Sequence, residues 1–456
     1  MPKRIFDAII IGSGQAGTPL AFKMASKGKK VAFIEREYFG GTCLNVGCTP
    51  TKAYVASARR MWETNQGEAL GVIIPEGSKV DLKKVKARKD ALIKKSVDGI
   101  SSDVEKNENI TFFKGSASFS GHKTVIINDQ ELRGDQIYIN VGGRAFIPDN
   151  FKDVNFLTNK TILELEDIPE HLIIVGGSYV GLEFGQMFRR FGSKVTIIEK
   201  GPVIIGREDE EVSAHILKFM KEEGIEFRLN ATCIGARNNP QKGISAAVDC
   251  KQGAPEITGT HLLLAVGRQP NTDTLNLEAT GVKTNNRGFI EVNDYLETNI
   301  EGIYALGDCN GKGAFTHTSY NDYEIIAENM FQGKDRKVSD RITTYGLFVD
   351  PPLGRAGMTK KEALEKGYNI MEANCAMSQV ARAREKGETN GFMRAIIDMD
   401  TDQILGAAVL GVGGDEVISS LLNVMYAKAS YTVIRDSVHP HPTVSELIPT
   451  MLGDLK

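Results

Sequence analysis

Residues 8–17 read Ala-Ile-Ile-Ile-Gly-Ser-Gly-Gln-Ala-Gly, and this short stretch decides the fold. Its apolar run is typical of a parallel strand that is buried on both faces. A helical pattern continues through Ala21 to Met24, and a second apolar run over 31–34 ends at Glu35. A strand, a glycine turn, a helix and a second strand that ends in an acidic residue together predict a dinucleotide-binding unit.

The glycines of this turn have separate steric roles. Gly12 makes the tight turn, and Gly14 lets a pyrophosphate approach the backbone at the helix N-terminus. Gly17 lets the helix pack closely against the strand, and Glu35 accepts hydrogen bonds from a ribose. The glycines alone would also fit an ordinary turn before a helix. The complete pattern around them favours a dinucleotide.

The same pattern occurs a second time further along the chain. Residues 172–175, Leu-Ile-Ile-Val, predict another buried strand, and residues 176–181 read Gly-Gly-Ser-Tyr-Val-Gly. A helix and a further strand follow, and that strand ends at Glu199, which lies 23 positions after the first glycine of the turn. Gly12 and Glu35 have the same spacing. The match predicts two dinucleotide-binding units in one chain.

The second turn departs from the fingerprint at one position. Gly176 and Gly181 occupy the outer glycine positions, but Ser178 stands where the middle glycine is expected. Serine is small enough to allow a close approach, although it alters the contacts to phosphate. Glu199 favours a free ribose hydroxyl and therefore NADH over NADPH. Nearby basic residues, among them Arg207, leave NADPH open.

A second distinctive stretch holds two cysteines. Residues 40–52 read Gly-Gly-Thr-Cys-Leu-Asn-Val-Gly-Cys-Thr-Pro-Thr-Lys, which includes Cys43 and Cys48. In a regular helix, residues five apart lie about 7.5 Å apart along the axis, whereas a disulfide needs Cα atoms within about 7 Å. A bond between them therefore requires an irregular segment at Cys43, which the glycines permit.

Three interpretations of this cysteine pair were compared. A redox-active pair is favoured, while two unpaired buried cysteines remain open because cysteine is a common small core residue. A structural zinc site would need two more ligands at a characteristic spacing, and the sequence has no second cysteine pair. The other cysteines are scattered and are interpreted as packing residues: Cys233, Cys250, Cys309 and Cys375.

Length and composition set the class of protein. A chain of 456 residues predicts two to four domains, and 41% hydrophobic with 25% charged residues is the balance of a globular protein. A net charge of −3 does not suggest nucleic acid or an anionic membrane as a partner. The sequence has neither a long apolar run nor a signal peptide. We expect a cytoplasmic enzyme, in which a lasting disulfide would be a working one.

Two later regions carry patterns of their own. Lysines are frequent over residues 79–105, and a solvated helix face explains them better than a binding patch. From about Arg341 the cofactor glycines stop, as in a packing or dimerisation domain. Residues 439–446 read His-Pro-His-Pro-Thr-Val-Ser-Glu, which fits either a base with an orienting carboxylate or a surface loop. The prolines argue against a helical metal-binding pair.

With these motifs in this order, the chain resembles the flavoprotein pyridine nucleotide–disulfide oxidoreductases, a family that includes dihydrolipoyl dehydrogenase, glutathione reductase and mercuric reductase. The resemblance implies that the first glycine unit binds FAD and the second binds NAD(P)H. The cofactor-binding residues that it implies are Gly12, Gly14, Gly17, Glu35, Thr42, Lys52, Gly176, Ser178, Tyr179, Gly181, Glu183, Glu199, Gly267 and Asp308.

The resemblance also implies individual roles around the flavin. Cys48 lies nearer the flavin, where a helix N-terminus and Lys52 favour its thiolate, and Cys43 is the outer thiol that attacks the substrate. Lys52 lies near flavin N5 with Glu183 as its ion-pair partner. Asp308 contacts the ribityl chain.

Further implied roles concern the nucleotide and the proton. Tyr179 shields the nicotinamide pocket. His441 is the catalytic base and Glu446 orients its ring, and both are contributed across a dimer interface. The partners implied are therefore a second copy of the chain, in a homodimer, and a small-molecule or metal-ion oxidant.

The fold class implied is α/β, with two Rossmann-like domains for FAD and NAD(P) and a C-terminal α+β dimerisation domain. The expected boundaries are 1–148 for the first part of the FAD domain and 149–265 for the NAD(P) domain. Residues 266–338 would complete the FAD and central domain, and 339–456 would form the interface domain.

The branch within the family is indicated by smaller motifs. Cys-Thr-Pro-Thr-Lys at the second cysteine differs from the form common in dihydrolipoyl dehydrogenases, and residues 315–317, 350–354 and 445–450 look like the mercuric-reductase-like branch. That branch includes reductases tied to reactive chlorine, hypothiocyanite and copper stress. Residues 451–456 lack the cysteine pair of true mercuric reductases, and no N-terminal metal-binding domain is present, so mercury reduction is not the expected main function.

Three functional interpretations follow. The first is an NAD(P)H-dependent reductase that uses Cys43 and Cys48 to reduce a disulfide, a metal ion or a reactive oxidant. The alternative is a dihydrolipoyl dehydrogenase of a 2-oxoacid dehydrogenase complex. A flavin-bearing scaffold without turnover is a third, and the intact cysteines, base and cofactor units argue against it.

Overall fold

The computed structural model describes residues 4–241, 243–249 and 254–455. Cys250 lies outside this range, as does the side chain of Cys233, so the packing predicted for both stays a prediction. The chain forms two compact units, which are described one at a time. The first unit combines Met1–Ala53, Lys86–Phe146 and Gly267–Arg341, and the second combines Tyr54–Val85, Ile147–Val266 and Ile342–Lys456. The four predicted domains stay a prediction, because each unit combines segments of more than one of them.

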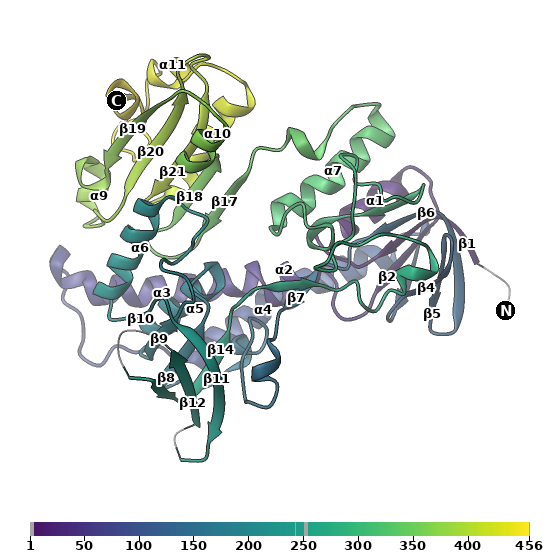
Figure 1. Ribbon diagram of the computed structural model, residues 1–456, viewed down its shortest axis with the longest axis horizontal. Coiled ribbons are helices and arrows are strands. Elements are labelled where there is room, and N and C mark those ends of the chain that lie inside the picture. The colour runs from purple at the N-terminus through teal and green to yellow at the C-terminus, as the bar shows by residue number, and fades with distance from the viewer. Residues whose placement is uncertain (1–3, 242, 250–253, 456) are drawn as a thin grey trace. The chain divides into compact units, whose positions relative to one another are not determined.

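The first unit is built on a largely parallel sheet (Figure 1). Its order is β3-β2-β1-β6-β5-β4, and β16 also pairs with β6. The strands are β1 (Arg4–Ile11), β2 (Val31–Glu35), β3 (Ile110–Lys114), β4 (Ser118–Gly121), β5 (Thr124–Ile127), β6 (Gln130–Ile139) and β16 (Ile303–Ala305). Strands β3, β2, β1, β6 and β16 run parallel to one another, whereas β5 pairs antiparallel with both β6 and β4. The buried parallel strand and the glycine turn predicted for residues 8–17 are thus confirmed.

Helices pack against this sheet through small and aliphatic side chains. Leu20, Ala21 and Met24 of α1 (Gly17–Ser26) are buried in one cluster with Ile10 of β1 and Ile325 of α7. The helices of this unit are α1, α2 (Gly41–Val46), most of α4 (Leu82–Glu105) and α7 (Thr316–Gln332), and α3 (Cys48–Gln66) begins in it. A short antiparallel pair, β7 (Gly143–Ala145) with β15 (Arg268–Pro270), joins two of its segments.

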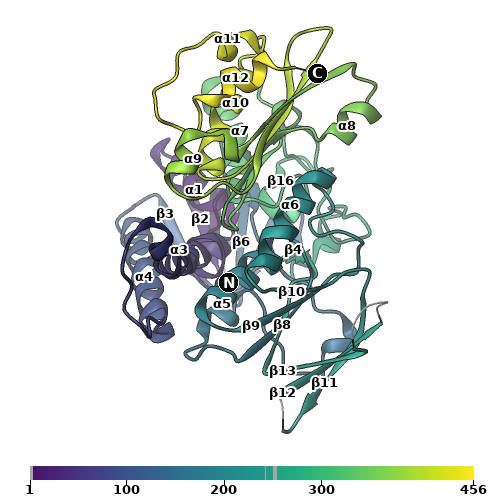
Figure 2. The ribbon, with the colours of Figure 1, turned by 90° about the vertical axis from the view of Figure 1, so that its left-hand side faces the viewer.

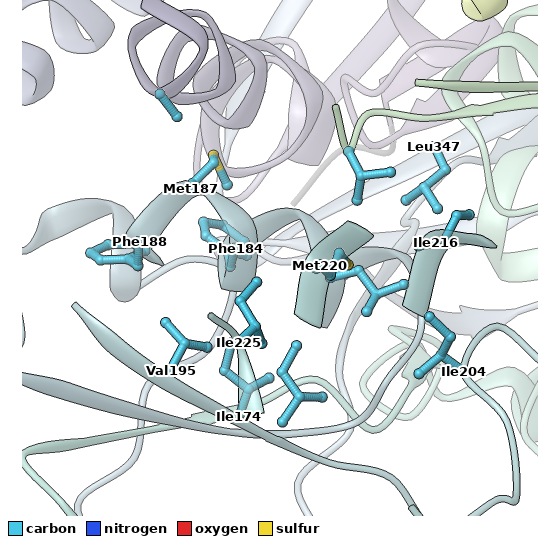
Figure 3. Close-up of a cluster of buried hydrophobic side chains, with 14 of the residues drawn as sticks. Ile174, Phe184, Met187, Phe188, Val195, Ile204, Ile216, Met220, Ile225 and Leu347 are labelled. Atoms are coloured by element: carbon cyan, nitrogen blue, oxygen red, sulfur yellow. The ribbon is translucent and has the colours of Figure 1, made fainter. Parts of the chain in front are cut away.

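The second unit contains a parallel sheet in the order β10-β9-β8-β14, of which Figure 2 labels β10, β9 and β8. Its strands are β8 (His171–Val175), β9 (Lys194–Ile198), β10 (Glu226–Arg228) and β14 (His261–Leu264), with helices α5 (Tyr179–Phe191) and α6 (Glu210–Glu222). Figure 3 shows Phe184 and Phe188 of α5 against Ile174 of β8 and Val195 of β9. A small antiparallel sheet adds β11 (Thr232–Asn239), β12 (Gly243–Asp249) and β13 (Glu256–Gly259).

The same unit continues into a five-stranded antiparallel sheet in the order β17-β18-β21-β20-β19 (Figure 1). Its elements are β17 (Thr344–Leu347), β18 (Leu353–Gly357), α8 (Lys360–Glu365), β19 (Ile370–Ala376), α9 (Ala381–Glu385), β20 (Phe392–Asp398), β21 (Ile404–Leu410), α10 (Gly414–Tyr426), α11 (Thr432–Arg435) and α12 (Leu447–Gly453). The core beneath α10 and α12 combines branched aliphatic side chains with alanines and methionines. The absence of cofactor glycines after Arg341 therefore coincides with an α+β sheet layer, as predicted.

Short 3₁₀ helices occupy the connections. They are η1 (Gly67–Leu70), η2 (Asp149–Phe151), η3 (Ile162–Glu164), η4 (Leu277–Ala279), η5 (Gly307–Asn310), η6 (Val338–Asp340) and η7 (Met377–Gln379). Within the range that the structure describes, no helix is both long enough and apolar enough to cross a membrane.

Candidate active site

The cysteine pair lies where two helices of the first unit meet. Cys43 belongs to α2, Gly47 interrupts the helix with φ −129° and ψ −119°, and Cys48 begins α3. A Cβ on Gly47 would lie 2.8 Å from the carbonyl oxygen of Thr42, so only glycine permits this break. The sequence predicted an irregular segment at Cys43, but the structure places it at Gly47. Both cysteines are free thiols.

The two sulfur atoms have different surroundings. The sulfur of Cys48 lies 3.2 Å from the hydroxyl oxygen of Thr316, the first residue of α7. A hydrogen bond with Cys48, burial and the charge of Cys48 raise the pKa of the Cys43 thiol well above its usual range. Cys43 therefore keeps its proton, so a negative charge on the pair is expected at Cys48. The N-termini of α3 and α7, which both adjoin Cys48, favour that charge.

The glycine turn after β1 leaves no room for side chains. A Cβ on Gly14 would lie 2.7 Å from Oδ1 of Asn140, and one on Gly17 would lie 2.1 Å from the carbonyl oxygen of Gly12. Asn140 ties the turn to its surroundings, because its Oδ1 accepts a hydrogen bond from the Gly17 amide at 2.9 Å and its Nδ2 donates to the Leu306 carbonyl at 2.8 Å. Asn140 was not predicted from the sequence, because it is far from the glycines along the chain.

Glu35 is held beside this turn. Its carboxylate accepts hydrogen bonds from the backbone amide and the hydroxyl of Ser13, at 2.9 and 2.7 Å, and from the amide of Glu37 at 2.7 Å. The carboxylate is 9% exposed at the carboxyl end of β2. A fixed carboxylate beside a turn without side chains fits the ribose and pyrophosphate of a dinucleotide.

Asp308 lies in η5 at the carboxyl end of β16. Burial raises the pKa of its carboxyl group, and the guanidinium of Arg268, 3.4 Å away, opposes that rise. The preceding Gly307 donates its amide proton to Asp322 at 2.7 Å, and Arg341 pairs with the other oxygen of Asp322. Arg268 and Asp322 were not singled out from the sequence, although they position the predicted residue.

The remaining predicted residues of the first unit lie around these elements. Thr42 precedes Cys43 in α2, and Lys52 lies one turn beyond Cys48 in α3. Gly267 has a φ of +138°, which favours glycine, and its carbonyl accepts a hydrogen bond from the Phe146 amide at 3.0 Å. The glycine turn, the fixed Glu35 and the half-buried Asp308 fit a dinucleotide that carries a ribityl chain, as FAD does.

The second glycine turn repeats the first. A Cβ on Gly176 would lie 2.3 Å from the carbonyl oxygen of Ala265, and one on Gly181 would lie 2.0 Å from that of Gly176. Glu199 accepts hydrogen bonds from the amides of Gly177 and Gly201, both at 2.7 Å. These residues fit a second dinucleotide. Ser178 is exposed and has extended backbone angles, so it does not need the conformational freedom of glycine.

Tyr179 and Glu183 both lie on α5. Tyr179 is its first residue, and its ring packs edge to face on Tyr345 with 5.6 Å between the ring centres. Glu183 is buried and accepts a hydrogen bond from the Phe348 amide at 3.0 Å. Because Glu183 belongs to the second unit and Lys52 to the first, their ion pair stays a prediction.

His441 and Glu446 are brought together in the connection between α11 and α12. Nδ1 of His441 lies 2.8 Å from Oε2 of Glu446, while the side chains are 75% and 13% exposed. The segment is thus an exposed loop that also orients an imidazole. Their catalytic roles stay predictions. Among the described residues, no group of three or more His, Cys, Asp or Glu side chains is arranged to hold a metal ion.

Comparison with known proteins assigns both parts of the chain. A family model described as pyridine nucleotide-disulphide oxidoreductase matches residues 6–323, and the model of its dimerisation domain matches residues 343–452. The probable pyridine nucleotide-disulfide oxidoreductase RclA of Escherichia coli is 32% identical, over 99% of both chains. The dihydrolipoyl dehydrogenase of Thermus scotoductus is 33% identical, over 97% of this chain and 96% of that one.

A solved structure is similar over nearly the whole chain. It is described as a Cu(II) complex of the HOCl-induced flavoprotein disulfide reductase RclA from Escherichia coli. It covers 98% of this chain and 100% of its own, with a TM-score of 0.88 and 32% sequence identity. The α/β architecture with a C-terminal dimerisation domain is therefore confirmed.

Proposed function

Because the chain belongs to the pyridine nucleotide-disulphide oxidoreductases, we propose that it uses Cys43 and Cys48 as a dithiol–disulfide couple to reduce a small oxidant at the expense of NADH. The oxidant would be a disulfide, a metal ion such as Cu(II), or a reactive oxidant. The observation that carries this proposal is the asymmetry of the two thiols on either side of Gly47, with Cys48 against Thr316 and Cys43 holding its proton.

The family settles the class and the cofactors. The chain is a flavoprotein enzyme that depends on FAD and takes electrons from NAD(P)H. Its C-terminal part is the dimerisation domain of the family, in keeping with a homodimer. When bound, FAD supplies a two-electron relay between the nicotinamide and the cysteine pair. Glu35 and Asp308 would hold it in the first unit, and Glu199 would hold the nucleotide in the second.

For a disulfide substrate, we propose a sequence of two exchanges. The partner subunit's His441 takes the proton of Cys43, and the Cys43 sulfur attacks one sulfur of the substrate, which breaks the substrate bond; the imidazolium then returns the proton to the first thiol released. The Cys48 thiolate attacks the sulfur of Cys43, which forms the internal disulfide and releases a second thiolate that takes a proton from water. Two electrons pass from the dithiol to the substrate. The raised pKa of Cys43 is the reason that this thiol needs a base, and Glu446 orients the imidazole.

For Cu(II), the same couple balances with two metal ions. One dithiol yields one disulfide, two Cu(I) ions and two protons. Thiolates are soft ligands that suit copper, and Cys48 is the more exposed sulfur of the pair. The similar RclA structure, described as a Cu(II) complex, supports copper as an oxidant to test first.

The proposed preference for NADH rests on the fixed carboxylate of Glu199. Two backbone amides hold it in one orientation beside the second glycine turn. A carboxylate there accepts hydrogen bonds from a free ribose 2′-hydroxyl and repels a 2′-phosphate.

The central experiment measures NADH oxidation with Cu(II), Hg(II), glutathione disulfide and hypochlorous acid as separate oxidants. We expect Cys43→Ser and Cys48→Ser each to lower turnover with the physiological oxidant by about 100-fold or more, with FAD retained. Cys375→Ser is the matched control, because Cys375 is a buried thiol of the C-terminal sheet that the proposal does not use. Turnover that survives in both active-site variants would refute the proposal.

A second function is favoured by the similar length and identity of the Thermus scotoductus dihydrolipoyl dehydrogenase. Assaying dihydrolipoamide-dependent reduction of NAD⁺ beside the oxidants above separates the two. We expect lipoamide turnover to be the slower of these activities. A lipoamide activity that exceeds every other would assign the chain to a 2-oxoacid dehydrogenase complex instead.

A further inference from the structure

A buried polar cluster connects two layers of the second unit. The hydroxyl of Tyr345, on β17, donates a hydrogen bond to Oε1 of Glu208 at 2.6 Å. The other oxygen of Glu208 accepts hydrogen bonds from Nε and Nη2 of Arg355, on β18, at 3.0 and 2.8 Å. Nη2 of Arg355 also donates a hydrogen bond to Asp209 at 2.7 Å, and Asp209 accepts another from the backbone amide of Lys360 at 2.9 Å.

In this cluster, formed by Tyr345, Glu208, Arg355 and Asp209, Tyr345 is half-buried and the charged side chains are almost inaccessible to solvent. The side chains of Glu208, Asp209 and Arg355 are 0%, 4% and 1% exposed. Charges this deeply buried are tolerated only when they are paired and hydrogen-bonded, and such networks hold one geometry. Burial and the charge of Glu208 raise the pKa of Tyr345 far above its usual range, so its hydroxyl remains a proton donor.

One end of the cluster touches the nucleotide-binding turn. Tyr345 supports the ring of Tyr179, which is the first residue of α5 and follows Ser178 directly. The glycine turn would bring the pyrophosphate of a dinucleotide to this helix end. The hydroxyl oxygen of Tyr179 is buried, so its ring is turned into the protein and not out to solvent. Tyr179 is therefore packed inward at the helix end that the glycine turn offers to a nucleotide.

We propose that Tyr345 is a positioning residue that holds Tyr179 over the nicotinamide end of the nucleotide site, anchored by Glu208 and Arg355. This inference rests on the proposed function, in which Tyr179 shields that site. NADH must displace Tyr179 to bind. The apparent affinity for the nucleotide is therefore lowered by the fraction of molecules in which Tyr345 keeps Tyr179 in place.

The test removes one oxygen atom. Tyr345→Phe keeps the ring contact with Tyr179 and deletes the hydrogen bond to Glu208 together with the interaction between the two tyrosine hydroxyls. From the net contribution of one hydrogen bond, we expect the Kd of the oxidised holoenzyme for NAD⁺, measured by calorimetry, to fall by about twofold to tenfold. The KM for NADH should fall in parallel while kcat stays within about twofold. Tyr368→Phe, at an exposed tyrosine of the same unit, is the matched control and should change neither.

A double-mutant cycle separates positioning from a general structural effect. In a Tyr179→Ala background, Tyr345→Phe should leave the Kd for NAD⁺ unchanged, because the residue through which it acts is gone. An unchanged or weakened affinity in the single variant, or the same gain in both backgrounds, overturns the inference. If Tyr345→Phe does not retain FAD, Glu208→Gln takes its place in the same double-mutant cycle. It should also lower the Kd for NAD⁺.

The result is distinguishable from failure of the proposed function. If the wild-type enzyme binds NAD⁺ and reduces an oxidant but neither variant moves the Kd, only the positioning role of Tyr345 is refuted. If the wild-type holoenzyme binds no nucleotide at all, the proposed function is refuted and this inference with it.

Discussion

The two glycine turns of this chain share their outer glycines and the acidic residue that they bind, but different residues lie beside them. In the first, a Cβ on Gly12 would lie 2.3 Å from the carbonyl oxygen of Asn140, and in the second, a Cβ on Gly176 would lie 2.3 Å from that of Ala265. Asn140 and Ala265 therefore occupy equivalent positions. In both turns, the amide after the first glycine binds the acidic residue at the end of the next strand.

The exchange of Asn140 for Ala265 explains why the middle residue is glycine in the first turn and serine in the second. Oδ1 of Asn140 fills the space beside Gly14, at 2.7 Å from where a Cβ would lie, and it also binds the Gly17 amide. Ala265 has no carboxamide to place there, so the equivalent Ser178 meets no such obstacle. The first turn gains buried hydrogen bonds and must keep its glycine, whereas the second can accept a side chain.

The largest effect should come from breaking each turn separately. Gly12→Ala and Gly176→Ala both place a Cβ against a carbonyl oxygen at 2.3 Å, at backbone angles that disfavour alanine. We expect Gly12→Ala to lose FAD and all turnover. Gly176→Ala should retain FAD but lose kcat/KM for NADH by about 100-fold or more. Flavin absorbance per protein and steady-state kinetics measure the two effects.

Controls for these variants are available in both units. Gly99→Ala and Gly206→Ala introduce a Cβ that meets no described atom within 4 Å, and neither glycine has a positive φ. Both should behave as the wild type. Loss of FAD in Gly176→Ala, at a level matching Gly12→Ala, would show that the turns are not independent cofactor sites.

The second prediction converts the first turn into the second. Gly14→Ser should clash with Asn140 and destabilise FAD binding by about 1–3 kcal/mol. Asn140→Ala alone leaves the Gly17 amide without its partner, which costs about 1–3 kcal/mol, and leaves the Leu306 carbonyl with the Cys309 thiol as its donor. The double variant should lose less FAD affinity than the sum of the losses in the two single variants. FAD dissociation rates of the single and double variants measure this coupling. Strict additivity would contradict our account of Ser178.

These same residues show how much of the fold and of the site could be predicted from the sequence. The strand, turn, helix and acidic residue are close together in the chain, so local pattern was enough to predict both turns and their acids. Ser178 was visible as a departure, but its cause was not, because Asn140 meets Gly17 across 123 positions. Contacts of that separation follow from the order of strands in the sheet, which a single sequence does not reveal.

The cysteine pair shows the same limit. Spacing indicated that the helix must break, but Gly47 and not Cys43 breaks it, because the steric reason lies in the carbonyl of Thr42. Thr316 was quoted only as part of a branch motif, yet its hydroxyl reaches the sulfur of Cys48 from a helix 268 positions away. His441 and Glu446 were correctly paired because five positions separate them.

The third prediction compares the two acidic residues. Glu199→Gln removes the negative charge at the second turn, and we expect the preference for NADH over NADPH, measured as the ratio of kcat/KM values, to fall by about tenfold. Glu35→Gln changes the equivalent residue of the first turn and should weaken FAD retention without altering that ratio. A shift of nucleotide preference in Glu35→Gln would mean that we have exchanged the roles of the two turns.

The smallest effect concerns the reactive thiols, Cys43 and Cys48, which only the first unit has. The hydrogen bond with Cys48 and burial raise the pKa of the Cys43 thiol, and the Thr316 hydroxyl partly offsets that rise. Thr316→Val should therefore raise the pKa further. Since the thiolate forms as pH increases, alkylation of Cys43 by iodoacetamide in the reduced holoenzyme should shift to higher pH and slow by about twofold to tenfold at neutral pH. Thr316→Ser keeps the hydroxyl and should follow the wild-type pH profile. If Cys43 of the Thr316→Val variant were alkylated at the wild-type rate across this pH range, the Thr316 hydroxyl would not affect the pKa of the cysteine pair. The helix N-termini alone would then make the pKa values of the two thiols differ.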